Sequence, residues 1–305
     1  MTAVDGHVAR KRFGQNFLVS DGVVRKIVDA VAARPGDTLV EIGPGLGALT
    51  AHLLDRCDRL EVVEIDRDLI ARLRERWPAE RLAIHEGDAL AFDFATLKRE
   101  GSRLKIVGNL PYNISSPLLF HLVRFAPLVD DLHFMLQKEV VDRMVADPGG
   151  GDYGRLSVML QYHFYMERLF IVPPGAFNPS PKVDTAVVRM IPRIGRCEPR
   201  AGASAGIPTG GHDLNPPNGP KVSLGGTAPV LDEAVFARVV TAAFSQRRKM
   251  LRNTLRGVAT ESELESVGIA PTSRAEEVAL SGYVRLANTI SRRPGTLPDQ
   301  PADVA

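Results

Sequence analysis

The sequence predicts an α/β protein, a parallel doubly wound sheet followed by a small α-helical domain. Between residues 37 and 191, short β-branched runs alternate with amphipathic segments of helical spacing, the order that a parallel sheet with crossover helices requires. From Leu231 onward, apolar residues recur instead at spacings of three and four, which is typical of packed helices.

The elements of the sheet are predicted in chain order. The first five strands are Thr38–Ile42, Leu60–Ile65, Leu82–Leu90, Leu104–Leu110 and Leu132–Gln137. Helical spacing marks Leu46–Cys57, Arg67–Trp77 and Lys138–Val145. Two late strands lie within residues 163–172 and 184–191, joined by a Pro-rich loop, so we expect them to pair antiparallel at an edge of the sheet.

Composition divides the chain into four predicted segments. A Gly/Pro-rich stretch without an apolar face separates the sheet from the C-terminal helices, and the last residues are again Pro-rich. The predicted segments are a catalytic domain over 1–192, a linker or insertion over 193–229, a helical domain over 230–292 and a frayed tail over 293–305.

Composition also narrows the classes of function. The net charge of +2 means that any nucleic-acid surface must come from local clustering. The sequence has only two cysteines, no apolar leader and no run long enough to cross a membrane, so we expect a cytoplasmic protein. The seven histidines lack metal-ligand spacing, and no metal is assigned.

A glycine-rich turn joins the first predicted strand to the first helix. Gly43, Gly45 and Gly47 let the backbone turn tightly against a ligand. Glu64, about twenty residues further on, is placed to accept hydrogen bonds from ribose hydroxyls, and Asp88 ends the third strand where an adenine amine would lie. A purely structural turn is the alternative, with Asp88 as a capping or solvated loop residue.

The spacing of this turn favours one nucleotide cofactor over another. NAD sites usually show G-x-G-x-x-G, because a helix N-terminus must approach the pyrophosphate. Here the spacing is G-x-G-x-G, and Glu41 precedes the first glycine by two residues. An acid there suits the cationic methionine end of S-adenosylmethionine, which indicates a methyltransferase rather than an NAD oxidoreductase.

The stretch NLPYNISSP, residues 109–117, follows the fourth strand and is interpreted as a stiff loop. The Asn109 side-chain oxygen and a carbonyl from Leu110 or Pro111 can accept both N–H groups of an adenine amine, while Tyr112 stacks on the base. Positioning and electrostatics would then be the main catalytic terms. The alternative is a Pro-stiffened loop with a packed tyrosine.

A second aromatic residue lies in the Pro-rich loop between the late strands. Phe177 stands among prolines, where an exposed ring is unusual. Since a base that reaches the catalytic loop must be flipped out of its stack, this ring is a candidate for holding it. Packing of Phe177 under the loop is the alternative.

Together these motifs resemble the bacterial small-subunit (16S) ribosomal RNA adenine dimethyltransferases. The resemblance covers Arg10 to about Ile191 and resumes from Leu231 to Ile290. The motifs that carry it are KRFGQNFL, EIGPGLGALT, VVEIDRDL, GDAL, GNLPYNISSPLLFHL, FMLQKEVVDRM, YGRLSVMLQY, VPPGAFNPSPKVDTAVVR and FSQRRKMLRNTL. A departure is the stretch from about Arg196 to Pro229, which is longer than the family's usual interdomain link.

The resemblance implies a Rossmann-like class I methyltransferase sheet. It implies transfer of four methyl groups from S-adenosylmethionine to N6 of two adjacent adenines near the 3′ end of the rRNA, within the small ribosomal subunit or its precursor. The implied cofactor residues are Asn16, Leu18, Gly43, Glu64, Asp88 and Asn109. The implied catalytic loop is Asn109, Leu110, Pro111 and Tyr112, with Phe177 holding the target base.

Two basic clusters are candidates for phosphate contacts. The first is Arg10, Lys11 and Arg12, and the second is Arg247, Arg248 and Lys249 with Arg252 and Arg256, which we expect on a helix. Solvated helix faces are the alternative. Two further readings of the whole chain stay open, namely a large-subunit rRNA adenine methylase of the macrolide-resistance type and a mainly non-catalytic ribosome-assembly factor. Nothing in the sequence suggests more than a monomer.

Overall fold

The computed structural model describes residues 3–4, 7–8, 10, 14–193 and 229–293. Nearly all of the predicted linker and tail, with Lys11 and Arg12, lies outside this part of the chain. The chain forms two compact units, one of Met1–Asp142 and His163–Pro220 and one of Arg143–Tyr162 and Lys221–Ala305.

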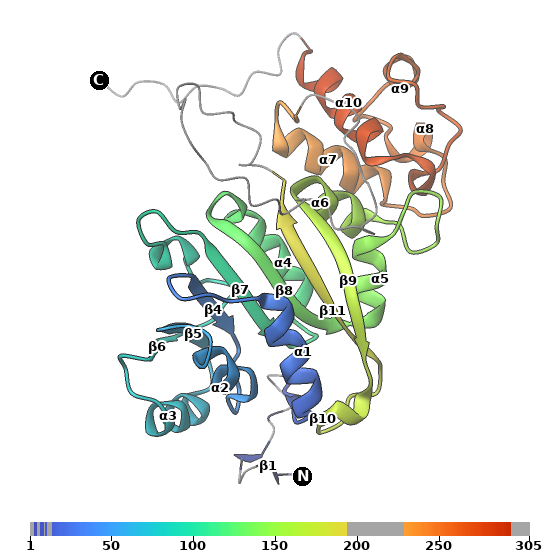
Figure 1. Ribbon diagram of the computed structural model, residues 1–305. Coiled ribbons are helices and arrows are strands. Elements are labelled where there is room, and N and C mark those ends of the chain that lie inside the picture. The colour runs from blue at the N-terminus through green and yellow to red at the C-terminus, as the bar shows by residue number, and fades with distance from the viewer. Residues whose placement is uncertain (1–2, 5–6, 9, 11–13, 194–228, 294–305) are drawn as a thin grey trace. The chain divides into compact units, whose positions relative to one another are not determined.

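The first unit is built on a seven-stranded sheet (Figure 1). Its order is β6-β5-β4-β7-β8-β11-β9, with parallel pairing from β6 through β8. The parallel strands are β4 (Thr38–Ile42), β5 (Leu60–Glu64), β6 (Leu82–Glu86), β7 (Leu104–Asn109) and β8 (Val129–Gln137). The strand order reverses beside β4, the place where doubly wound sheets bind ligands.

The two late strands complete the sheet as predicted. β11 (Thr185–Pro192) pairs antiparallel with both β8 and β9 (Phe164–Val172), so β11 is internal and β9 forms the edge. The predicted antiparallel pairing at an edge is therefore confirmed.

Helices cover both faces of the sheet (Figure 1). α1 buries Val24, Ile27, Val28 and Val31 in the core that also holds the strand residue Val62. The helices of this unit are α1 (Asp21–Val31), α2 (Ala48–Leu54), α3 (Arg67–Arg76), α4 (Ser115–Val123) and α5 (Lys138–Val145), the last of which runs on into the second unit. The predicted segments 46–57, 67–77 and 138–145 each contain one of them. Separate two-residue ribbons pair β1 (Ala3–Val4) with β2 (His7–Val8) and β3 (Phe17–Leu18) with β10 (Phe177–Asn178).

The second unit is helical, with a core of its own. Its helices are α6 (Arg155–His163), α7 (Glu233–Ala243), α8 (Leu251–Thr254), α9 (Glu261–Ser266) and α10 (Leu280–Ser291). Tyr153, Val158 and Tyr162 belong to this core together with Phe236 and Tyr283. Residues 143–162 therefore group with the C-terminal helices, whereas the predicted boundaries assigned them to the catalytic domain.

The first three residues of the second basic cluster are not on a helix, contrary to expectation, whereas Arg252 lies in α8. α7 ends at Ala243 and α8 begins at Leu251, and Arg247, Arg248 and Lys249 lie in the turn between them. In one continuous helix Arg247 would follow Ala243 on the buried face, so the chain leaves the helix where the apolar stripe stops. Within the described residues, no helix has the length and apolar character that a membrane span requires.

Candidate functional site

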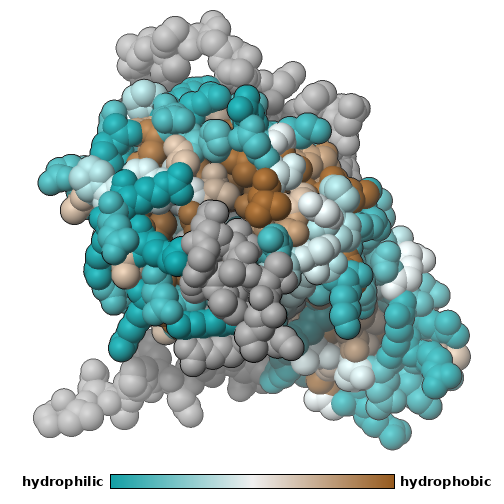
Figure 2. Space-filling model, turned by 90° about the horizontal axis from the view of Figure 1, so that it is seen from below, coloured by the Kyte–Doolittle hydropathy of each residue, from teal (hydrophilic) through white to brown (hydrophobic). Residues whose placement is uncertain are grey.

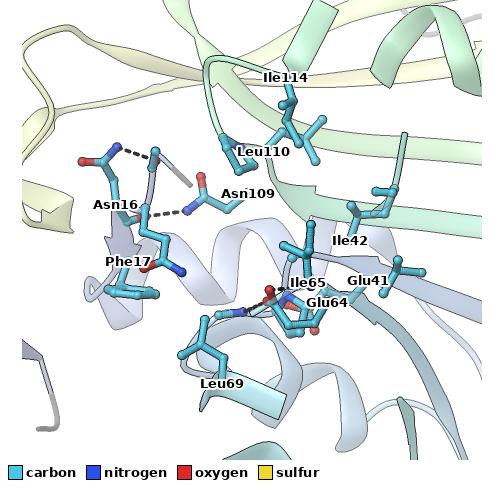
Figure 3. Close-up of a pocket in the computed structure, with 18 of the residues that line it drawn as sticks. Asn16, Phe17, Glu41, Ile42, Glu64, Ile65, Leu69, Asn109, Leu110 and Ile114 are labelled. Carbon is cyan, nitrogen blue, oxygen red and sulfur yellow. Dashed lines mark hydrogen bonds between the residues drawn. The ribbon is translucent and has the colours of Figure 1, made fainter. Parts of the chain in front are cut away.

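A cavity of about 200 Å³ opens at the carboxyl ends of the parallel strands. Figure 3 shows Asn109 and Asn16 on one side of it and Glu64, Ile65 and Leu69 on another. The residues lining it include nine predicted for the cofactor or the catalytic loop, which are Asn16, Leu18, Gly43, Glu64, Asp88, Asn109, Leu110, Pro111 and Tyr112. Seen from below, apolar side chains gather near the centre of a largely polar face (Figure 2).

The glycine turn is shaped by three left-handed residues. Gly43, Gly45 and Gly47 have φ angles of 67°, 60° and 82°. A side chain at Gly47 is disfavoured for two reasons. The left-handed φ is strained for any other residue, and a Cβ atom there would lie 2.5 Å from the Trp77 ring. The turn thus approaches the cavity with bare backbone.

Glu64 is held at the tip of β5 by backbone donors. One carboxylate oxygen accepts from the N–H groups of Ile65 and Asp66, both at 2.9 Å, and the other accepts from Gly45 at 3.3 Å. Burial raises the pKa of Glu64, although these hydrogen bonds oppose the shift. The bonds fix the carboxylate in the cavity wall, with acceptor capacity remaining for a ligand hydroxyl.

Glu41 is the second acidic group of this wall, 1% exposed in β4. The Thr50 hydroxyl donates to it at 2.6 Å. Burial, with the nearby Glu64 charge adding to it, raises the pKa of Glu41 to about 8. Two buried carboxylates in one wall favour a ligand that brings positive charge.

Asn109 ends β7 with its amide orientation set. Its Nδ2 donates to the Asn16 carbonyl at 2.8 Å (Figure 3). The side-chain oxygen is therefore the end of the amide that stays available to accept a hydrogen bond.

The loop after Asn109 uses some of its carbonyls internally. The Pro111 carbonyl accepts from Ile114 at 3.2 Å and the Tyr112 carbonyl accepts from the Ser115 hydroxyl at 2.9 Å. Among the described residues, no donor occupies the Leu110 carbonyl. Of the two predicted acceptors, the structure therefore leaves the one on Leu110 open.

The predicted loop 109–117 is shorter than expected. Residues 115–117 already form the first turn of α4, which begins at Ser115. A proline is tolerated there because the first helical residues have no intrahelical N–H partner to lose.

The segment from Gly14 to Leu18 forms one wall of the cavity. On one side β3 pairs with β10, so that Leu18 faces Phe177. On the other side Gln15 donates to Asp66 at 3.0 Å. These contacts at both ends hold Asn16 beside Asn109.

Phe177 is not an exposed ring. It is 4% exposed, belongs to the core that contains α1, and does not line the cavity. Of the two alternatives, the ring is packed under the loop, because β10 pairs with β3. The role of Phe177 in holding the base stays a prediction.

The candidate phosphate-binding residues differ in their surroundings. Arg10 forms ion pairs with the carboxylates of Asp66 and Asp68, so its charge is neutralised by residues beside the cavity. Arg247 contacts the Gly151 carbonyl and lies 3.6 Å from Glu276. Four other side chains of the second cluster are exposed, namely Arg248, Lys249, Arg252 and Arg256.

Sequence reasoning did not single out several lining or supporting residues. Ile65 follows Glu64 and is 47% exposed in the cavity wall, which a strand-end position next to a predicted ribose ligand could have suggested. Gln15 and Thr185 offered no signal, since their partners are distant in the sequence.

Comparisons with known proteins point in one direction. Residues 6–202 match the model of the family described as ribosomal RNA adenine dimethylase. The ribosomal RNA small subunit methyltransferase A of Cupriavidus metallidurans is 55% identical over 93% of this chain and 94% of its own. The protein of the same name from Thiobacillus denitrificans is 53% identical over 94% of this chain and 100% of its own.

Two solved structures share the fold. A dimethyladenosine transferase from Plasmodium falciparum superposes with a TM-score of 0.68 at 23% identity, covering 88% of this chain and 95% of its own. The 23S rRNA methyltransferase ErmE superposes with a TM-score of 0.61 at 23% identity, covering 91% of this chain and 100% of its own.

Proposed function

The chain belongs to the ribosomal RNA adenine dimethylase family, and on that premise we propose that it acts in the cytoplasm, as a monomer, on the small ribosomal subunit or its precursor. The reaction is transfer of four methyl groups to N6 of two adjacent adenines near the 3′ end of 16S rRNA. The relatives named for the small subunit support this choice of substrate.

The observation that carries the proposal is the pair of acceptors on the Asn109 loop. The Asn109 side-chain oxygen faces away from the bond to Asn16, and the Leu110 carbonyl is open. Two such acceptors bind both N–H groups of the adenine amine and raise the electron density on its nitrogen. Pro111 fixes the backbone between this pair and Tyr112, which stacks on the base.

The cavity residues fit S-adenosylmethionine, which supplies an electrophilic methyl group when bound. Glu64 accepts from the ribose hydroxyls, Ile65 covers the adenine ring and Asp88 meets its amine. Glu41 offers its buried carboxylate to the cationic end of the molecule. Asn16 and Leu18 close the cavity from the N-terminal side.

We propose that the exposed residues Arg248, Lys249, Arg252 and Arg256 contact RNA phosphates. They follow α7 without a carboxylate partner among the described residues. Binding through such residues weakens with added salt. Arg10 is a weaker candidate for this role than predicted, because two aspartates already neutralise it.

We also propose that Phe177 holds the target base. Because its ring is buried, the loop that carries it has to rearrange before the ring reaches the base.

The test is transfer of labelled methyl groups to small subunits that lack these modifications, with large subunits as the competing substrate. Label recovered as N6,N6-dimethyladenine in 16S rRNA, and lost in Asn109→Ala, is the expected result. Label on large subunits alone would assign a resistance-type methylase. Tight binding to small subunits with no label would indicate an assembly factor.

A further inference from the structure

We propose that Thr185 is a positioning residue for Tyr112, and that its hydroxyl fixes the tyrosine ring in the orientation that stacks on the target adenine. The inference rests on the proposed function, because it takes Tyr112 as the residue that meets the base. It adds a residue from β11, two strands away from β7 in the sheet, to the machinery of the catalytic loop.

Thr185 is itself rigidly held. It is the first residue of β11, where it pairs with Gln137 of β8 and with Val172 of β9. Its exposed fraction is 0%. A side chain on a strand paired at both sides is a fixed reference point for a neighbouring loop.

The contact joins two hydroxyl groups. The Thr185 Oγ1 lies 2.6 Å from the Tyr112 phenolic oxygen, and either group can be the donor. Among the described residues, neither hydroxyl has a second hydrogen-bond partner. Burial raises the pKa of Tyr112, so the phenol stays neutral and keeps its proton for this bond.

The hydroxyl of Thr185 is not needed for packing alone. Valine has nearly the same shape and suits a buried strand at least as well. A buried hydroxyl is costly unless it has a partner, and here the partner belongs to the wall of the cavity. The hydrogen bond to Tyr112 therefore explains why a threonine, and not a valine, stands at this position.

Fixing the far end of the ring orients the stacking surface before the base arrives. A tyrosine ring turns about two side-chain bonds. A hydrogen bond at the phenolic oxygen fixes the position of the far end of the ring and so restrains the first bond. Because a phenolic hydroxyl prefers to lie in the plane of its ring, the hydrogen bond also favours one tilt of the ring about the second bond. Asn109 is restrained in the same way by the Asn16 carbonyl at the other end of the loop. The flipped base then meets a ring and two acceptors in a fixed mutual arrangement, which lowers the entropy cost of the reactive geometry.

The experiment measures single-turnover methyl transfer to unmodified small subunits, with enzyme and cofactor saturating, for wild type, Thr185→Val, Thr185→Ser and Tyr112→Phe. We expect Thr185→Val and Tyr112→Phe each to slow transfer about three- to tenfold, the value of one neutral hydrogen bond. Thr185→Ser restores the rate to within about twofold. The double variant Thr185→Val/Tyr112→Phe is no slower than either single one, because both remove the same bond.

A purely structural role would give a different pattern. It would weaken cofactor binding, whereas we expect the Kd of the cofactor to be unchanged in every variant. Wild-type rates in Thr185→Val, or losses that multiply in the double variant, would overturn the role of Thr185. If Thr185→Val is poorly folded, full activity of Tyr112→Phe overturns it instead. A wild-type protein inactive on small subunits would overturn the proposed function itself.

Discussion

The two walls of the cavity are held together in different ways. On the cofactor wall, the hydrogen-bond partners of the two acidic residues are close in the sequence. Thr50 is nine residues from Glu41, and Gly45 is nineteen residues from Glu64. On the catalytic wall, Asn109 is bound by Asn16, 93 residues away, and Tyr112 by Thr185, 73 residues away. One wall is built by its own motif, and the other depends on the assembled fold.

The largest effect should come from the catalytic wall. Asn109→Ala removes the side-chain acceptor, and we expect single-turnover methyl transfer to fall about 10²- to 10³-fold, the usual loss for one preorganised group. The Kd of the cofactor should change by less than about threefold. Ser116→Ala, just after the loop in the first turn of α4 and outside the cavity lining, is the control and should stay within about threefold of the wild-type rate. Equal losses in both variants would mean that the loop as a whole, not the Asn109 oxygen, supplies the rate.

The converse effect should come from the cofactor wall. Glu64→Ala removes the ribose acceptor and leaves three backbone N–H groups without their partner, so the Kd of the cofactor should rise about 10- to 100-fold. With cofactor saturating, the transfer rate should recover to within about threefold. Glu61→Gln is the control, since Glu61 is on the same strand but binds Arg59, Arg99 and His85 outside the cavity. A rate that does not recover would show that the two walls are coupled.

The same difference explains which features of the fold and the site could be predicted from the sequence. The fold class, the strands and the glycine turn are encoded locally, and the family and fold comparisons confirm the Rossmann-like methyltransferase architecture. The use of S-adenosylmethionine follows from the same family membership. α1 also had a readable signal, in the helical spacing of Val24, Ile27, Val28 and Val31, and it was not predicted.

The errors share one physical origin. Phe177 looks exposed in a Pro-rich stretch, yet its burial is decided by pairing with Leu18 near the other end of the chain. Likewise α6 joins the C-terminal helices because Tyr162 packs on Phe236, at 4.9 Å between ring centroids. Long-range contacts of this kind leave no local pattern, so a single sequence did not reveal them.

A third experiment asks whether the glycine turn owes its shape to its own residues. Gly47→Ala places a Cβ atom in a left-handed position and 2.5 Å from the Trp77 ring, so we expect the free energy of unfolding to fall by about 2–3 kcal/mol. Gly101→Ala has a similar φ of 75° but nothing within 4 Å, and should lose only about 1 kcal/mol. Denaturant titration of both variants separates the clash from the strain. Equal losses of stability in the two variants would mean that the contact with Trp77 does not help to set the shape of the turn.

The smallest effect concerns pH and Glu41. The free protein holds this carboxyl protonated below its raised pKa of about 8, whereas a cationic ligand favours the ionised form. Binding of S-adenosylmethionine should therefore release a proton and tighten by up to about tenfold from pH 7 to pH 9. The amino group of the ligand titrates in the same range, so S-adenosylhomocysteine, which lacks the positive sulfur, and the Glu41→Gln variant serve as controls. Calorimetry in buffers of different ionisation enthalpy counts the protons. An unchanged ratio of the two ligands' affinities across this range would mean that Glu41 does not sense the sulfonium, and that the cofactor wall recognises its ligand through Glu64 and shape alone.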